Sequence, residues 1–186
     1  MTDLSSGILL LSDPFLKDPN FIRSVIFLCD YTSENGAFGF VVNKNFDHEI
    51  GDLIEGAEGI RFPVYEGGPV QKDTLHFLHQ RPDLVTGGQE ITSGIFWGGD
   101  FSLVLELLRE DRLTKTDIRF FLGYSGWDQG QLEGEIKEKS WIARPANAKL
   151  VFTPNQDIPQ LWKTALKELG GEYGQMVNYP IDPQLN

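Results

Sequence analysis

Residues 21–44 read FIRSVIFLCDYTSENGAFGFVVNK and contain the strongest β-hairpin signal of the chain. An apolar run at 25–29 predicts a strand over 21–30, and the segment 38–44 predicts a second one. Asn35 and Gly36 between them tolerate the positive φ angles that a turn requires. Because the first strand is apolar without alternation, both of its faces should be covered.

Further strands are expected along the whole chain, separated by glycine pairs and Asp-Pro turns. They are predicted at 7–11, 63–66, 74–79, 94–97, 117–124, 140–144 and 149–152.

Two helices have clear start signals. Asp100 is a candidate N-cap for a helix reaching about Glu110, with apolar residues three and four positions apart on one face. A second helix is predicted to begin at Asp157, with Pro159 in its first turn, and to end at Gly170. Its apolar stripe comprises Ile158, Leu161, Trp162, Ala165, Leu166 and Leu169.

Many strands and few helices, without strict alternation, predict an α+β fold. A chain of 186 residues suits one domain, and we expect it to span residues 1–186. The only cysteine, Cys29, lies in an apolar run, so we interpret it as a buried hydrophobic residue. The sequence shows no secretion signal and no apolar run of about 18 residues, which predicts a cytoplasmic protein without membrane spans.

The charge balance argues against direct nucleic-acid binding. The chain has 16 Lys and Arg against 27 Asp and Glu, for a formal net charge of −11. DNA affinity depends on neutralising phosphates with cationic side chains, and no basic cluster stands out here. The same charge disfavours anionic membranes.

Residues 121–136 read FLGYSGWDQGQLEGEI and pose the main functional question. A phosphate-binding loop is disfavoured, because the spacing fits neither glycine-rich motif and the neighbouring charges are acidic. A nucleophile elbow with Ser125 needs G-x-S-x-G, but Trp127 occupies the last glycine position. The three histidines, His48, His76 and His79, all precede that serine.

A structural corner is the third interpretation of this stretch. Asp128 would cap a following helix, and Gln131 would complete a capping box. Trp127 would fill a core pocket, with its indole N–H bonded to a partner. Gly130 and Gly134 weaken a helix, so we expect close packing to explain them.

No metal or cofactor site is predicted. His76 and His79 are three residues apart on a strand, so they face opposite sides, and we expect both to be satisfied by hydrogen bonds. Asp13, Asp18 and Asp30 match no cation-binding loop.

Several segments together resemble the YqgE/AlgH family of bacterial proteins. They are GILLLSDPFLKDPNFIRSVIFLCDY, NGAFGFVVNK, YEGGPV with LHFLH, GIFWGGDF, FLGYSGWDQGQLEGEI with SW, and the closing helix. The resemblance implies a compact α+β domain with a strongly bent, barrel-like, mostly antiparallel sheet flanked by a few helices. The family carries the label of a transcriptional regulator, and the resemblance implies no catalytic residues.

The resulting hypothesis is a non-enzymatic regulatory or binding module that acts through a protein partner or a small ligand. The alternative is a hydrolase-like enzyme that uses Ser125 or an acidic pocket. The candidate pocket or motif residues are Gly67, Gly68, Pro69, Tyr124, Ser125, Gly126, Trp127, Gln131 and Glu133.

Overall fold

Strand β9 (Ile118–Trp127) lies at the centre of a curled sheet and contacts three other strands. The computed structural model describes residues 2–181, and within them the sheet has ten strands. The other strands are β1 (Ile8–Ser12), β2 (Val25–Thr32), β3 (Gly36–Val41), β4 (Asn45–Glu49), β5 (Pro63–Glu66), β6 (Val70–His79), β7 (Gln89–Thr92), β8 (Ile95–Trp97) and β10 (Trp141–Pro145).

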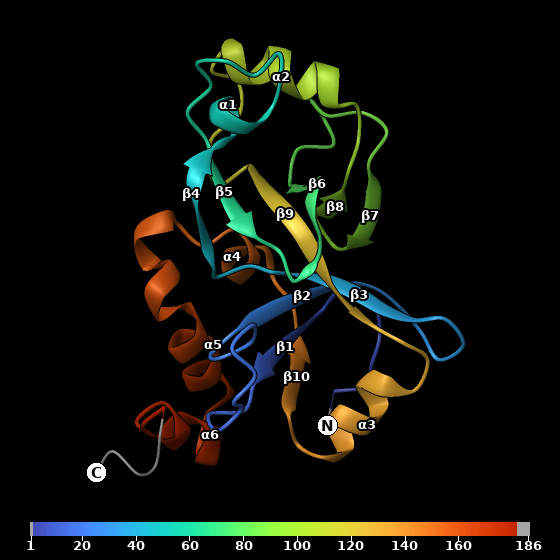
Figure 1. Cartoon of the computed structure of the whole chain (residues 1–186), viewed down its shortest axis with the longest axis vertical. Coiled ribbons are helices and arrows are strands. Elements are labelled where there is room, and N and C mark those ends of the chain that lie inside the picture. The colour runs from blue at the N-terminus through green and yellow to red at the C-terminus, as the bar shows by residue number, and fades with distance from the viewer. Residues whose placement is uncertain (1, 182–186) are drawn as a thin grey trace.

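The strands follow the order β10-β1-β2-β3-β9-β6-β8-β7, with β4 and β5 branching from β9. The β5–β9 pair is parallel and the remaining pairs are antiparallel. The sheet curls into a half-barrel within one compact α+β domain (Figure 1). The strongly bent, mostly antiparallel sheet expected from the sequence is therefore confirmed.

Helices cover the sheet from several sides. Figure 1 shows α1 and α2 over one end, α5 and α6 along one flank, and α3 on the opposite flank. Their bounds are α1 (Ile50–Leu53), α2 (Phe101–Arg109), α3 (Gln131–Lys137), α4 (Ala148–Val151), the 3-10 helix η1 (Asn155–Gln160), α5 (Leu161–Leu169) and α6 (Gly171–Met176). Within residues 2–181, no helix combines the length and apolar character that crossing a membrane requires.

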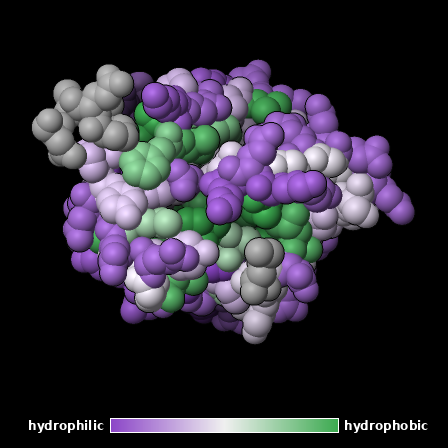
Figure 2. All heavy atoms as spheres, turned by 90° about the horizontal axis from the view of Figure 1, so that it is seen from below, coloured by the Kyte–Doolittle hydropathy of each residue, from purple (hydrophilic) through white to green (hydrophobic). Residues whose placement is uncertain are grey.

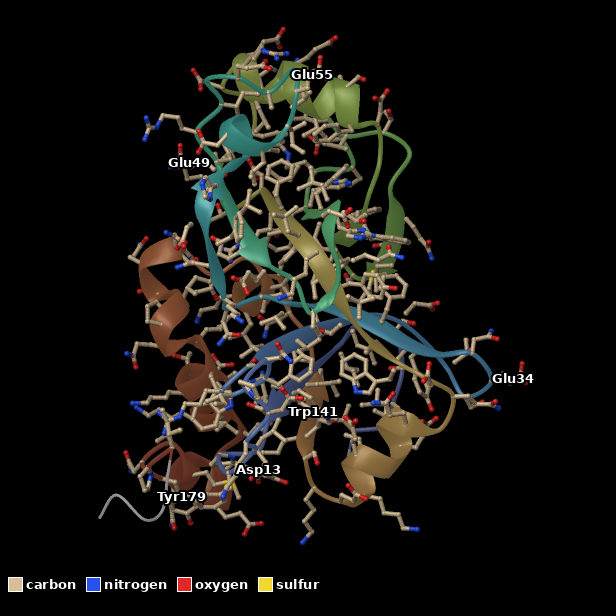
Figure 3. The ribbon with its side chains drawn as sticks, viewed as in Figure 1. Asp13, Glu34, Glu49, Glu55, Trp141 and Tyr179 are labelled. Carbon is tan, nitrogen blue, oxygen red and sulfur yellow. The ribbon has the colours of Figure 1, made fainter. Side chains whose placement is uncertain are left out.

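The β2–β3 hairpin confirms the strongest sequence signal. Gly36 has a φ of 86° at the turn, as predicted, and pairs with Thr32. Glu34 lies at the far tip of this hairpin (Figure 3). β2 begins at Val25, later than expected, because the chain before it turns back through a hydrogen bond from the Ser24 N–H to the Phe21 carbonyl.

Both faces of β2 are buried, as its apolar run predicts. Val25, Phe27 and Cys29 pack into a first core cluster beneath α4 and α5. Ile26 and Leu28 point the other way, into a cluster that includes α3. A third cluster joins α1 and α2 to the far end of β9.

One expected strand and one expected helix start are wrong. Residues 149–152 belong mostly to the short helix α4, whose first turn is capped by the Asn147 side chain accepting from the Leu150 N–H at 2.9 Å. A short apolar run cannot distinguish a buried helix from a buried strand. The helix predicted to begin at Asp157 begins later. Asp157 lies inside the 3-10 helix η1 and is not an N-cap, and α5 begins at Leu161.

The other predicted helix features, one N-cap, one apolar stripe and one helix end, are confirmed. Asp100 caps α2 by accepting from the Leu103 N–H at 3.1 Å. The apolar stripe of the last long helix is buried against the first core cluster, and Gly170 ends α5 with a φ of 69°.

One face of the molecule exposes apolar side chains to solvent. Seen from below, apolar side chains lie between hydrophilic ones (Figure 2). Phe15 and Tyr179 are exposed and stack with ring centroids 5.4 Å apart, and Tyr179 lies at the lower end of the molecule (Figure 3). This end of the molecule also holds Asp13 (Figure 3).

Candidate functional site

An open cleft of about 520 Å³ lies where β2, β3, β6, β8 and β9 meet, at the edge of the first core cluster. Its walls combine aromatic side chains with a few polar groups. The lining residues are Asp30, Asn35, Gly36, Ala37, Phe38, Val70, His76, Trp97, Tyr124, Gly126, Trp127 and Asp128.

Aromatic rings form the walls of this cleft. The Phe38 ring centroid lies 5.2 Å from that of Trp97 and 6.0 Å from that of Tyr124, both in edge-on arrangements. The His76 ring stacks on Trp97 at 6.3 Å and meets Tyr124 edge-on at 6.1 Å. All four are partly buried, so each keeps part of its ring surface open.

His76 is the unusual polar group of the cleft. Its Nε2 is buried and has no hydrogen-bond partner among residues 2–181, so the prediction that both histidines are satisfied is wrong for this one. Burial lowers the pKa of His76, which favours a neutral ring near pH 7. An unpaired buried nitrogen costs free energy and often marks a place where a partner is missing.

His79 provides the contrast on the same strand. Its Nε2 lies 3.1 Å from the Gly98 carbonyl, and its Nδ1 accepts from the Arg81 N–H at 3.2 Å. It faces Phe96 and Phe77 rather than the cleft, as the strand alternation predicts. Burial also lowers the pKa of His79, although its bond to Gly98 opposes the shift.

The rim of the cleft is acidic. Asp30 at the end of the apolar part of β2 and Asp128 just after β9 are both exposed lining residues. Asp30 accepts a long hydrogen bond, 3.4 Å, from the Ser6 hydroxyl. No Lys or Arg is among the lining residues, so the local field is negative.

Ser125 does not belong to a catalytic arrangement. Its side chain is fully buried, and its hydroxyl donates to the Gly67 carbonyl at 3.1 Å. A nucleophile must reach solvent and contact a base, and this hydroxyl instead fixes the β5–β6 connection to β9. The contact explains why a small hydroxyl residue suits this position.

The glycine motifs come together in space, but they do not share the cleft. A Cβ on Gly67 would lie 2.4 Å from the Gly123 carbonyl oxygen, and one on Gly68 would lie 2.2 Å from the Tyr124 backbone. Only residues without a side chain allow this approach of two backbones. Gly68 and Pro69 border a separate small recess beside Lys44.

The stretch 121–136 is a strand-to-helix corner, as predicted, but its strand is longer than the expected 117–124. β9 continues through Trp127, and the turn follows at residues 128–130. The positive φ of 68° at Gly123 bends the strand, which lets its second half pair with β3 after its first half pairs with β5. A glycine inside a strand pattern often marks such a bend.

The predicted cap at Asp128 is also wrong. The N-cap of α3 is Gly130, with a φ of 76°, and the Asp128 N–H donates to the Gln131 side chain at 3.0 Å. Only one half of the expected capping box therefore forms. The close-packing explanation for Gly130 and Gly134 fails too, because a Cβ on either would meet nothing within 4 Å.

Trp127 is anchored as predicted. It is buried, and its indole N–H donates to Glu135 Oε2 at 2.9 Å; the same oxygen accepts from the Trp141 indole at 2.7 Å. Gln131 donates to the other oxygen of Glu135 at 2.9 Å. Glu133 accepts from the Tyr31 hydroxyl at 2.8 Å, a bond that raises the Tyr31 pKa. Gln131 and Glu133 thus hold α3 in place and line no part of the cleft.

A buried cation lies outside the cleft. Arg119 on β9 donates to the Thr153 carbonyl, and its guanidinium carbon lies 4.8 Å from the Tyr65 ring centroid. Burial lowers its pKa. These contacts connect the central strand to the segment after α4, which gives Arg119 a structural role.

Sequence reasoning identified Tyr124, Gly126 and Trp127 but missed Asp30, Phe38, His76 and Trp97 as neighbours of these residues. The missed side chains come from separate strands, so no local spacing connects them. Within residues 2–181, no group of three or more His, Cys, Asp or Glu side chains is arranged to hold a metal ion.

The comparisons with known proteins extend over almost the whole chain. The family model described as AlgH-like matches residues 9–174. The chain belongs to the AlgH-like family. The resemblance seen in the sequence motifs is therefore confirmed.

AlgH-like relatives of similar length are found in other bacteria. A UPF0301 protein of Chlorobaculum tepidum is 40% identical over 183 residues, covering 98% of this chain and 96% of its own. A UPF0301 protein of Cytophaga hutchinsonii is 39% identical over 184 residues, covering 98% and 100%. The names of these relatives state no activity.

Two solved structures share the fold. The crystal structure of a Corynebacterium diphtheriae protein matches with a TM-score of 0.78 at 19% identity, covering 96% of this chain and 94% of its own. The solution structure of the AlgH protein from Pseudomonas aeruginosa matches with a TM-score of 0.71 at 23% identity, covering 97% and 98%. At these identities the likeness concerns the AlgH-like fold alone.

Proposed function

We propose that this AlgH-like protein is a non-enzymatic binding module, and that the aromatic cleft between β3, β6, β8 and β9 is its binding site. The observation that carries the proposal is the partly open set of rings around His76, whose Nε2 has no protein partner. Ligand sites are typically concave, mostly apolar and equipped with a few polar groups that orient the ligand.

The absence of a working nucleophile at Ser125 supports binding rather than turnover. Its hydroxyl is used in a backbone contact, and His76 and His79 make the ring contacts described above instead of bonding it. Hydrolysis by this serine would require the β5–β6 connection to open, which would break the glycine packing around Gly67.

The proposed function retains the regulatory role that the family resemblance suggests, exercised in the cytoplasm through a ligand or protein partner. A net charge of −11 favours this route over direct contact with DNA. Salt-sensitive, sequence-specific DNA binding by the purified protein near physiological salt would contradict it.

The test uses the tryptophans as reporters in two-dimensional NMR. A small-molecule library is added to labelled protein, and the indole N–H signals of Trp97 and Trp162 are followed. Trp97 lines the cleft, whereas Trp162 donates to the Ser12 carbonyl at 3.0 Å in the core beneath α5. The proposal expects ligands that shift Trp97 but not Trp162 and remain chemically unchanged. It fails if no compound shifts Trp97, or if bound compounds are converted and the Ser125→Ala variant stops converting them.

A further inference from the structure

We infer that the cleft binds an organic cation, an ammonium or guanidinium group that sits among the rings of Phe38, Trp97 and Tyr124 below the carboxylates of Asp30 and Asp128. This inference rests on the proposed function, because it names the ligand class of the same cleft.

The arrangement of the rings is the first support. Phe38 lies 5.2 Å from Trp97 and 6.0 Å from Tyr124 between centroids, and both pairs are edge-on. The three rings pack against one another, and all three line the same cleft, so each presents part of its surface to a ligand bound there. A cation within about 6 Å of such ring faces is attracted by their quadrupoles, most strongly for tryptophan. The partial burial of the rings strengthens this attraction by removing water.

The charges around the cleft are the second support. Asp30 and Asp128 lie at its rim, and none of the lining residues is Lys or Arg. Both carboxylates are exposed and make no ion pair among the described residues, so they remain open to a charged ligand. An anion or a nucleotide phosphate would meet only negative charge here. The net charge of −11 attracts cations over longer distances as well.

The unpaired histidine is the third support. His76 Nε2 is buried without a partner beside the ring of Trp97. Since that atom has almost no accessible surface, a ligand would contact the face of the ring rather than Nε2, and burial lowers the pKa of His76, so the neutral ring adds no positive charge to the cleft near pH 7. A metal ion fits less well, because the described residues offer no group of three ligating side chains here.

The decisive experiment uses probe pairs that differ in charge but hardly in shape. Choline is compared with its neutral carbon analogue 3,3-dimethylbutan-1-ol, and N-acetyl-arginine amide with N-acetyl-citrulline amide. Each is titrated into the labelled protein while the Trp97 and Trp162 indole signals are recorded. The first pair represents a free small cation and the second a side chain of a partner protein. We expect the charged member of at least one pair to bind roughly 3- to 30-fold more tightly and to shift Trp97 but not Trp162.

Two double variants with the same net charge distinguish attraction by the carboxylates at the cleft from attraction by the net charge of the whole protein. Asp30→Asn with Asp128→Asn removes both rim charges, whereas Asp47→Asn with Glu172→Gln removes two exposed charges that do not line the cleft. The rim variant should weaken binding about 3- to 10-fold, and the remote variant by less than about twofold. All four positions are exposed, so both variants should fold. Equal weakening in the two variants would overturn the inference.

The outcomes also distinguish this inference from the proposed function. If neutral analogues bind as tightly as the cations, or if only neutral or anionic library compounds shift Trp97, the cation inference is wrong and the binding site stands. If neither probe pairs nor library compounds shift Trp97, both fail. If the arginine derivative binds more tightly than choline, the natural ligand is a side chain of a partner protein. If choline binds more tightly, the natural ligand is a free small cation.

Discussion

The two halves of β9 lie in different settings on either side of Gly123. In the first half, Phe120 and Phe121 are fully buried, and the strand is paired with β5 on one edge and β6 on the other. In the second half, Tyr124 and Gly126 line the cleft, and the strand pairs with β3. One strand thus supplies packing at one end and ligand-accessible surface at the other, with the bend at Gly123 between them.

The largest expected effect tests the packed half. Phe120→Ala should lower the free energy of unfolding by about 4 kcal/mol, because it leaves a cavity between Phe62 and Phe77. Tyr124→Ala should cost less than half as much, since that ring is partly open. Urea denaturation followed by circular dichroism measures both values. Equal losses would mean that the cleft half is as tightly packed as the other.

The second prediction tests the bend. Gly123→Ala should destabilise the protein by about 3 kcal/mol, because the new Cβ would lie 2.6 Å from the Gly68 carbonyl oxygen and the φ of 68° disfavours a side chain. Gly126→Ala is the matched control on the same strand. Its Cβ would lie 3.3 Å from the Tyr124 ring and 4.0 Å from the Ala37 carbonyl oxygen, so the cost should stay below about 1 kcal/mol. If the two variants unfold at the same urea concentration, Gly123 is not the strained point.

The third prediction concerns the carboxylate that anchors the end of β9. Glu135→Ala should cost about 2 kcal/mol, because the indole N–H groups of Trp127 and Trp141 lose their shared acceptor. Glu135→Gln keeps a carbonyl oxygen in the same place and should recover most of the loss. Thermal unfolding and near-ultraviolet circular dichroism report stability and the tryptophan environment. A Gln variant as unstable as the Ala variant would show that the negative charge, rather than the acceptor, matters.

The smallest effect is a pH dependence beside the second half of β9. Burial lowers the folded-state pKa of His76 below its ordinary value of 6.5, so the unfolded chain binds the proton more readily. The free energy of unfolding should therefore fall as the pH drops below 6.5, by at most about 1.4 kcal/mol per pH unit for this histidine.

His76→Phe should flatten this slope between about pH 7.5 and 5.5, measured by urea denaturation in matched buffers. The remaining slope should include the contribution of His79, whose pKa burial also lowers. An unchanged slope in the variant would show that His76 is not responsible for the dependence.

Local signals in the sequence were enough for much of the fold. The turn at Gly36, the cap at Asp100 and the apolar stripe of α5 each depend on residues close together in the chain. Their physics is decided by backbone conformation and helical spacing, which the sequence displays directly. The family motifs added the bent sheet, which local reasoning alone did not establish.

The cleft could be predicted only in part. Tyr124, Gly126 and Trp127 belong to one motif, but Phe38, His76 and Trp97 reach them from three other strands whose registers are set by long-range pairing. The role of Ser125 was equally hidden, because its hydroxyl bonds a carbonyl 58 positions away. The failed cap at Asp128 has a local reason, since β9 extends through Trp127 and Gly130 supplies the left-handed turn.

The position of β1 bears on how the chain is made. β1 is synthesised before β10 but pairs with it along its whole length, and the Ser12 carbonyl accepts a hydrogen bond from the Trp162 indole across 150 positions. One edge of β1 therefore stays unpaired until β10 has been synthesised. Folding should be slow compared with that of helical proteins of this size, because contacts between distant segments close large loops.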